Sequence, residues 1–287
     1  MRSLEDAANV RSVPERIVGF LRPTARYMFT IESHVYAMAI AASVLLAFFP
    51  FLVLILSLTR ALLPGSAVGE MVLIGVEDFL PKDPGLVSFV TRNVSWAASL
   101  RGQVEVVSTI ALVISSQGIF MPLEVALNRL WRFSDDRSYL ANQVASFLFA
   151  MACGLLALGA AVFSSANVSL LRTVFDSLPV VPQPWKVVVL KLASLPFVTT
   201  IILLIYWKLP HGPVRFRTVA PVALWTAVAV EIAHALYLWA WTLLKVRAAY
   251  GPFFISVTVL LGGFVGAMIV LAGGEFCARR GRKLAQS

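Results

Sequence analysis

Long apolar runs separated by short polar connections recur along the whole chain. A bilayer core about 30 Å thick is crossed by roughly 20 helical residues at 1.5 Å each, and six runs reach about that length. They cover residues 37–63, 103–121, 141–171, 187–207, 219–244 and 252–276. The pattern predicts an all-α polytopic membrane protein with six transmembrane helices.

The runs divide the chain into three parts. Residues 1–36 form a mixed, charged segment, residues 37–277 the six-span membrane domain, and residues 278–287 a basic tail. Because the charged segment is too long for the start of a secretory signal, we expect the first span to remain as an anchor.

The connection between the first two spans, residues 64–102, is long and not plainly polar. Apolar residues recur at helical spacing on both sides of Pro81-Lys82-Asp83-Pro84. This spacing predicts two amphipathic helices joined by a proline turn. They could gate or cover the bundle, or they could form a simple packed hairpin, and the sequence leaves both interpretations open.

Composition supports the membrane class. The chain is 59% hydrophobic and only 14% charged, whereas soluble domains carry about 25% charged residues. A net charge of +9 could indicate a nucleic-acid partner, but its distribution favours topology. With the N-terminus inside, fifteen Lys and Arg residues lie on that side and eight on the other. Both termini are therefore expected in the cytoplasm, facing anionic lipid headgroups, with no nucleic-acid partner.

An ionisable residue within a span is a functional candidate because burying charge in lipid is costly. Glu231 lies near the middle of the fifth span, and His234 and Tyr237 follow on the same helical face. Such a stripe could form a proton relay or bind a cationic group. Alternatively, it could be a structural polar contact between helices.

Lys191 and two prolines complete the candidate path. Lys191 is expected about 6 Å inside the outer end of the fourth span, well above Glu231, so snorkelling is favoured over pairing. Pro50 and Pro196 each remove a backbone hydrogen bond and should kink the first and fourth helices. Kinks can line a transport site or simply shape the bundle. In the sixth span, Gly262, Gly266 and Gly273-Gly274 would permit close helix contact.

Asn128, Arg129 and Trp131 follow the second span. An uninterrupted helix over residues 103–133 would be about 46 Å long, so it must protrude from the membrane or break near Pro122. Asn128 and Arg129 could cap neighbouring helices or contact headgroups, and we favour capping.

Motifs of soluble enzymes are absent from the sequence. It contains no Walker loop, HExxH, CxxC or GxSxG. The histidines His34, His211 and His234 lie in separate segments, so no metal site, cofactor or enzymatic activity is expected.

Several short stretches form an ordered set over roughly residues 20–280. They are Ala39-Ile40-Ala41 through Ala47-Phe48-Phe49-Pro50, Ser116-Gln117-Gly118-Ile119-Phe120, Ala126 to Trp131, Tyr206 to Pro210, Glu231, Tyr250-Gly251 and Gly274-Glu275. Together, in this order and spacing, they resemble the YihY/BrkB family of membrane proteins. Within this resemblance, the chain departs from the family's pattern at the single positions Ala42, Ala47 and Gly262.

The resemblance implies a multi-pass protein of the bacterial inner membrane that supports envelope integrity. We predict a transporter or an exporter of lipids or small solutes, with its polar path near Glu231. The alternative is a non-transporting envelope or scaffold protein. A ribonuclease, an activity once assigned to the family, is disfavoured. The sequence does not indicate the oligomeric state.

Overall fold

The structure, a computed structural model, describes residues 13–62, 103–133, 142–156, 183–244 and 246–286, with the single positions 88, 92, 140 and 159. Every regular element in these residues is a helix. They are α1 (Val13–Met28), α2 (Ile31–Leu62), α5 (Gln103–Trp131), the helix Asn142–Leu156, α7 (Gln183–Lys208), α8 (Phe216–Leu244), α9 (Val246–Tyr250), the 3₁₀ turn η2 (Gly251–Phe253) and α10 (Phe254–Gln286).

Four of the described helices are long and apolar enough to cross a membrane: Ile31–Leu54, Val106–Trp131, Phe216–Trp241 and Phe254–Leu284. The helix Asn142–Leu156 and the segment Ser194–Lys208 of α7 are apolar but shorter, and they overlap the third and fourth predicted spans. The all-helical class therefore holds for the described residues, while the count of six spans stays a prediction. The amphipathic helices predicted in 64–102 lie outside the described residues, apart from positions 88 and 92.

Side chains on the outer surface of these helices are apolar. Trp225 is 72% exposed and Trp239 65%, and Val107 and Ile114 are similarly open. Water would disfavour so much exposed apolar surface, whereas lipid tails accommodate it. The outer surface therefore fits a bilayer.

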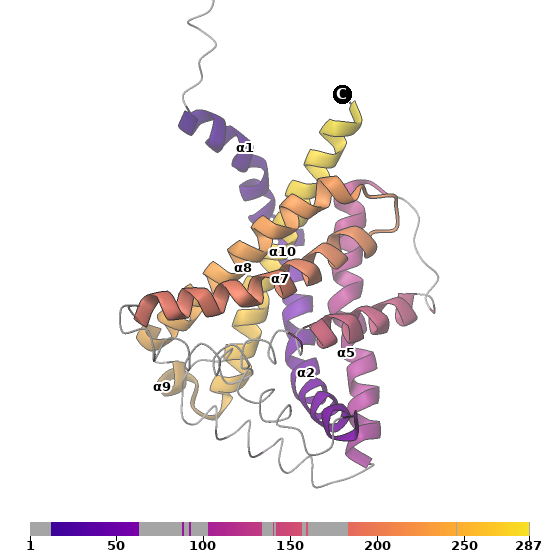
Figure 1. Ribbon diagram of the computed structural model, residues 1–287, viewed down its shortest axis with the longest axis vertical. Coiled ribbons are helices and arrows are strands. Elements are labelled where there is room, and N and C mark those ends of the chain that lie inside the picture. The colour runs from indigo at the N-terminus through magenta and orange to yellow at the C-terminus, as the bar shows by residue number, and fades with distance from the viewer. Residues whose placement is uncertain are drawn as a thin grey trace, which may run out of the picture.

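Helix α10 is central to the bundle because it packs against α2, α5 and α8 (Figure 1). Small residues bring it close to its neighbours: a Cβ at Gly263 would lie 3.3 Å from the Cα of Ala41, and one at Gly273 would overlap Thr226 and Tyr206. Glycine is needed at such positions because any side chain would push the helices apart.

Local signals determine where the helices begin and end. α2 begins after Thr30, whose Oγ1 accepts a hydrogen bond from the backbone N–H of Ser33 at 3.3 Å, as an N-cap residue does. α5 ends when Arg132 adopts a left-handed φ of 63° and the Phe133 N–H donates to the Asn128 carbonyl at 3.0 Å. This is the Schellman arrangement of helix C-termini.

Prolines are accommodated inside several helices. α5 does not break at Pro122 but continues to Trp131, giving a length of about 43 Å at 1.5 Å per residue. α2 continues through Pro50, and its second half runs in a different direction from its first (Figure 1).

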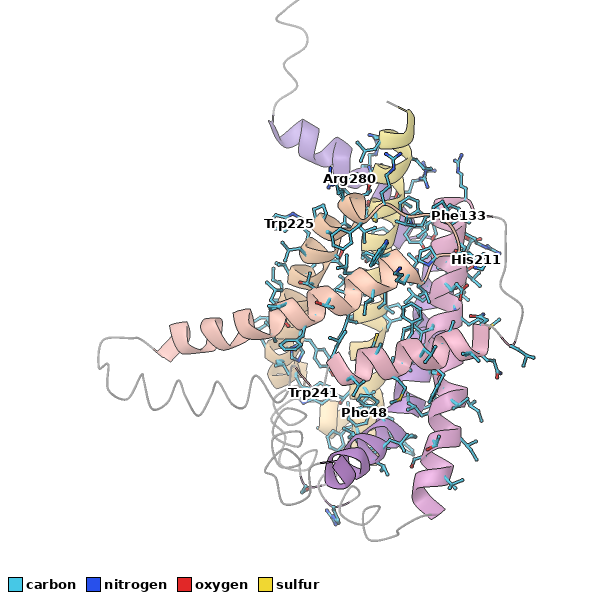
Figure 2. All side chains as sticks on the ribbon, turned by 45° about the vertical axis from the view of Figure 1, so that its right-hand side comes forward. Phe48, Phe133, His211, Trp225, Trp241 and Arg280 are labelled. Atoms are coloured by element: carbon cyan, nitrogen blue, oxygen red, sulfur yellow. The ribbon has the colours of Figure 1, made fainter. Side chains whose placement is uncertain are left out.

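One end of the bundle gathers α1, the end of α5, the loop 209–215 between α7 and α8, and the end of α10. The Asn128 side chain accepts a hydrogen bond from the His211 N–H at 2.9 Å, and Arg282 donates to the Leu130 carbonyl. Figure 2 shows Phe133, His211 and Arg280 at this end, and Phe48 and Trp241 toward the other. We call it the basic end, because nine exposed cations of the described residues lie there: Arg22, Arg26, Arg129, Arg132, Lys208, Arg215, Arg217, Arg280 and Lys283.

Candidate functional site

Glu231 lies in the middle of α8, where it faces α7. Its Oε1 accepts a hydrogen bond from the Ser194 hydroxyl at 3.1 Å, and the side chain is half-buried. Glu231 is fifteen residues from the start of α8 and Ser194 fourteen from the end of α7. Both therefore lie about 21–22 Å from the basic end by helical rise. The antiparallel hairpin thus places a carboxylate and a neutral hydroxyl together in the middle of the predicted fifth span.

Lys191 lies on α7 three residues before Ser194. The axial offset from Ser194 is about 4.5 Å, so the backbone of Lys191 is near the level of Glu231. The sequence estimate placed the two much farther apart because it fixed each depth from predicted outer span ends. The hydrogen bond instead gives the register of the hairpin directly. The side chain of Lys191 lies outside the described residues.

His234 and Tyr237 continue the stripe of Glu231 along α8 toward α10. Both side chains are half-buried. The Tyr237 hydroxyl donates to the Thr258 carbonyl of α10 at 2.9 Å, and its ring lies 5.8 Å from that of Trp241. The stripe thus contacts α7 at Glu231 and α10 at Tyr237, so its two ends face different helices.

Pro196 lies two residues after Ser194, inside α7. The Thr200 hydroxyl donates to the Pro196 carbonyl at 2.7 Å. Proline removes the N–H that would bond the carbonyl four residues earlier, at Leu192. The backbone beside Ser194 therefore has one hydrogen bond fewer than a regular helix.

Asn128, Arg129 and Trp131 all lie at the basic end, remote from Glu231. Asn128 is 5% exposed and holds the loop 209–215 through the His211 N–H. Arg129 pairs with Glu32 at 3.0 Å, with both side chains more than 60% exposed. Trp131 stacks on Phe133 with ring centroids 6.0 Å apart.

A further buried polar cluster joins α1 to α10 at the basic end. The Thr24 hydroxyl donates to Glu275 Oε2 and accepts a hydrogen bond from Arg279 Nη2 at 2.9 Å. Glu275 and Arg279 lie 3.3 Å apart, with side chains 10% and 16% exposed. The i, i+4 spacing of a carboxylate and an arginine was the signal in the sequence. The sequence analysis named Glu275 only within the family-like stretch Gly274-Glu275 and did not pair it with Arg279.

Glu124 was also missed. It lies within α5 and is only 4% exposed. The predicted second span ended at Met121, so Glu124 was placed beyond it, whereas the apolar helix continues to Trp131.

Among the residues that the structure describes, no group of three or more His, Cys, Asp and Glu side chains could hold a metal ion.

These features define a multi-helix membrane protein with a polar site between its helices. The chain belongs to the BrkB family, also called YihY: the family described as "Virulence factor BrkB" matches residues 30–286. A curated relative, a "UPF0761 membrane protein" of Chromohalobacter salexigens, is 25% identical over 252 residues, which are 86% of this chain. The chain spans 59% of the length of that relative. No solved structure matches the chain.

Proposed function

We propose that this protein is a transporter that moves a lipid or a small solute across the inner membrane, along a path between α7, α8 and α10. The observation that carries the proposal is the carboxylate of Glu231, hydrogen-bonded to the neutral hydroxyl of Ser194 in the middle of the hairpin. A carboxylate within a membrane span is costly, so one that is present there is a candidate for a functional role. Here that role is to bind the polar or cationic group that passes through.

The backbone beside the site supports this interpretation. Pro196 leaves α7 with one hydrogen bond fewer than a regular helix close to Ser194. Discontinuities of this kind line substrate sites in many transporters because freed backbone groups can bind the substrate or an ion. We place the basic end, with both termini, on the cytoplasmic side because lysines and arginines are enriched in cytoplasmic loops.

A non-transporting scaffold protein is the alternative. It is favoured by the Tyr237–Thr258 hydrogen bond, which ties α8 to α10 as a packing contact would. In that case Glu231 and Ser194 would only hold α7 against α8. The two functions differ in what a change at Glu231 should affect, either a flux or the stability of the fold.

Glu231→Gln tests the proposal because it removes the charge but keeps the shape and the ability to accept a hydrogen bond. We expect the variant to lose most of the protein-dependent movement of a fluorescent phospholipid across proteoliposomes. Its membrane abundance and melting temperature should remain those of the parent. Glu32→Gln, the same change at an exposed carboxylate, is the matched control and should retain the flux.

Two other results would count against the proposal. A Glu231→Gln variant that loses thermal stability and abundance would favour the scaffold function. Unchanged flux in a stable variant would remove Glu231 from the path.

Mass spectrometry identifies the substrate. Lipids and solutes that copurify in native nanodiscs with the parent, but not with Glu231→Gln, are the candidates. Cleavage of tRNA by the purified, nuclease-free protein would instead revive the ribonuclease interpretation.

A further inference from the structure

A second candidate site lies at the basic end, where the end of α5 meets the end of α10. The ring of Trp131 lies against Gly281, at which a Cβ would overlap it. Arg282, the next residue, donates to the carbonyl of Leu130. These contacts place Leu130 and Trp131, at the end of α5, beside Gly281 and Arg282 of α10.

Arginine side chains gather at this junction. Arg282 lies within electrostatic reach of Arg132 and Arg279, and of the carboxylate of Glu275. Arg279 is already paired with Glu275 and hydrogen-bonded to Thr24. Among the residues that the structure describes, the guanidinium groups of Arg132 and Arg282 are therefore in excess over the carboxylate of Glu275. Like charges repel at this range, so a bound anion would stabilise the arrangement.

The side chain of Trp131 points to the same ligand chemistry. The indole Nε1 of Trp131 is buried and has no hydrogen-bond partner among the described residues. An indole N–H can only donate, so whatever satisfies it must be an acceptor. Together with Arg132 and Arg282, it would make a site whose side chains offer only donors. An acceptor-rich anion fits such a site, and arginine forks match the oxygens of phosphate.

Arg132 also occupies a backbone position that usually belongs to glycine. Its φ of 63° is the left-handed conformation at the C′ position of the Schellman motif. A non-glycine residue in this conformation is less stable than glycine, so stability alone does not account for an arginine. Strain of this kind is common where a side chain has a functional task.

We propose that Trp131, Arg132 and Arg282 form a binding site for the phosphate of an anionic phospholipid headgroup. The site lies at the level where headgroups meet the protein, because two candidate spans end at Trp131 and Leu284. It is separate from Glu231 and does not depend on transport through that site.

Arg132→Gly is the decisive variant because it removes the guanidinium and also relieves the left-handed strain. The full-length protein in detergent is titrated with short-chain phosphatidylglycerol, and binding is followed by the rise in melting temperature. We expect the parent to bind and Arg132→Gly to bind about tenfold more weakly, the effect of losing a charge-assisted contact. The variant without lipid should melt no lower than the parent.

Arg22→Gln is the matched control because it removes one exposed cation from the same end, on α1. It should change the dissociation constant by less than about twofold, since it removes only long-range attraction. Equal losses in Arg22→Gln and Arg132→Gly would overturn the site in favour of a diffuse charge effect. Unchanged binding by Arg132→Gly would overturn it as well.

Two further measurements identify the ligand and the donor. Inorganic phosphate and short-chain phosphatidylcholine are titrated in parallel, and a response to inorganic phosphate without a response to phosphatidylglycerol would overturn the lipid assignment. Replacing Trp131 with its benzothienyl isostere, which has sulfur in place of the N–H, should weaken phosphatidylglycerol binding several-fold while keeping the ring packing. Full binding by that isostere would remove Trp131 from the site.

Discussion

The carboxylates of Glu275 and Glu231 both lie in long apolar helices, but their surroundings differ. Glu275 at the basic end is 10% exposed at its side chain, interacts with Thr24 and Arg279, and is flanked by glycines in close helix contact. Glu231 in the middle of α8 is half-buried and accepts a hydrogen bond from the neutral Ser194. The first arrangement suits a fixed joint between helices. The second leaves the carboxylate able to exchange its partner for a ligand.

The close packing near the basic end gives the largest expected effect. Gly273→Ala would place a methyl group against the Thr226 hydroxyl and the hydroxyl of fully buried Tyr206, which donates to the Val270 carbonyl. Because two helices must shift to admit it, we expect a loss of about 3 kcal/mol in stability. The loss should appear as a lower melting temperature in detergent and lower membrane abundance.

Gly266→Ala provides the matched control on the same helix, because a Cβ there meets nothing within 4 Å. It should not destabilise the protein and should gain slightly from the higher helix propensity of alanine. Equal melting temperatures for the two variants would show that α10 is not packed as closely at Gly273 as the structure has it.

The next effect concerns the charge at the joint. Glu275→Gln removes the carboxylate that faces Arg279 but leaves a group that can accept a hydrogen bond from Thr24. The partly buried guanidinium would then lack its counter-charge, at a cost of about 2 kcal/mol. The melting temperature of the purified variant measures that cost.

Two other carboxylates sharpen the comparison. Glu32→Gln breaks the ion pair with Arg129, but that pair is more than 60% exposed, and solvent screening limits the loss to at most about 0.5 kcal/mol. Glu231→Gln should likewise leave stability nearly unchanged while it removes flux. If Glu231→Gln proved as destabilising as Glu275→Gln, the contrast between a fixed joint and an exchangeable site would be lost.

Hydrophobic pattern alone predicted the helical class and the position of Glu231 within a span, because both depend on local composition. The hydrogen-bond partner of Glu231, Ser194, was not predictable from the hydrophobic pattern. The Glu231–Ser194 contact depends on the register of the α7–α8 hairpin, which the loop 209–215 sets. The Thr24–Glu275 bond joins residues 251 positions apart, and no local pattern carries that information.

Two helices continue through prolines. α1 contains Pro23 and lies in the segment 1–36, for which no helix was predicted. For α5 the sequence left open a protruding helix or a break near Pro122, and the helix continues through Pro122. In both cases tertiary contacts outweigh the loss of one backbone hydrogen bond. Thr24, next to Pro23, is bonded to Glu275, and the residues that follow Pro122, such as Leu123 and Leu127, are buried in the core. A local propensity rule does not include those contacts.

The smallest expected effect is a pH dependence of the folding stability that arises from Tyr27. The side chain of Tyr27, on α1, packs against the core of the bundle. Burial, followed by the nearby Tyr36, Glu32 and Glu275, raises the pKa of Tyr27 from 10.0 to about 12. At neutral pH the hydroxyl is protonated in both the folded and unfolded states, so it contributes no pH dependence. Above pH 10 the unfolded state releases its proton first, and the folded state loses stability as the pH rises toward 12.

Tyr27→Phe should therefore remove part of the alkaline destabilisation and leave the pH dependence below about pH 9 unchanged. The melting temperatures of the parent and Tyr27→Phe are measured from below about pH 9 to about pH 12. Their difference at each pH is the quantity of interest, because the titration of other groups cancels in it. A difference that grows above pH 10 in favour of the variant indicates that α1 is docked against Glu275 as the structure has it. A difference that stays constant with pH would mean that Tyr27 titrates alike in both states, so α1 would not be seated there. The joint at the basic end would then lack the contribution of α1, and Glu275 would be held by Arg279 without Thr24.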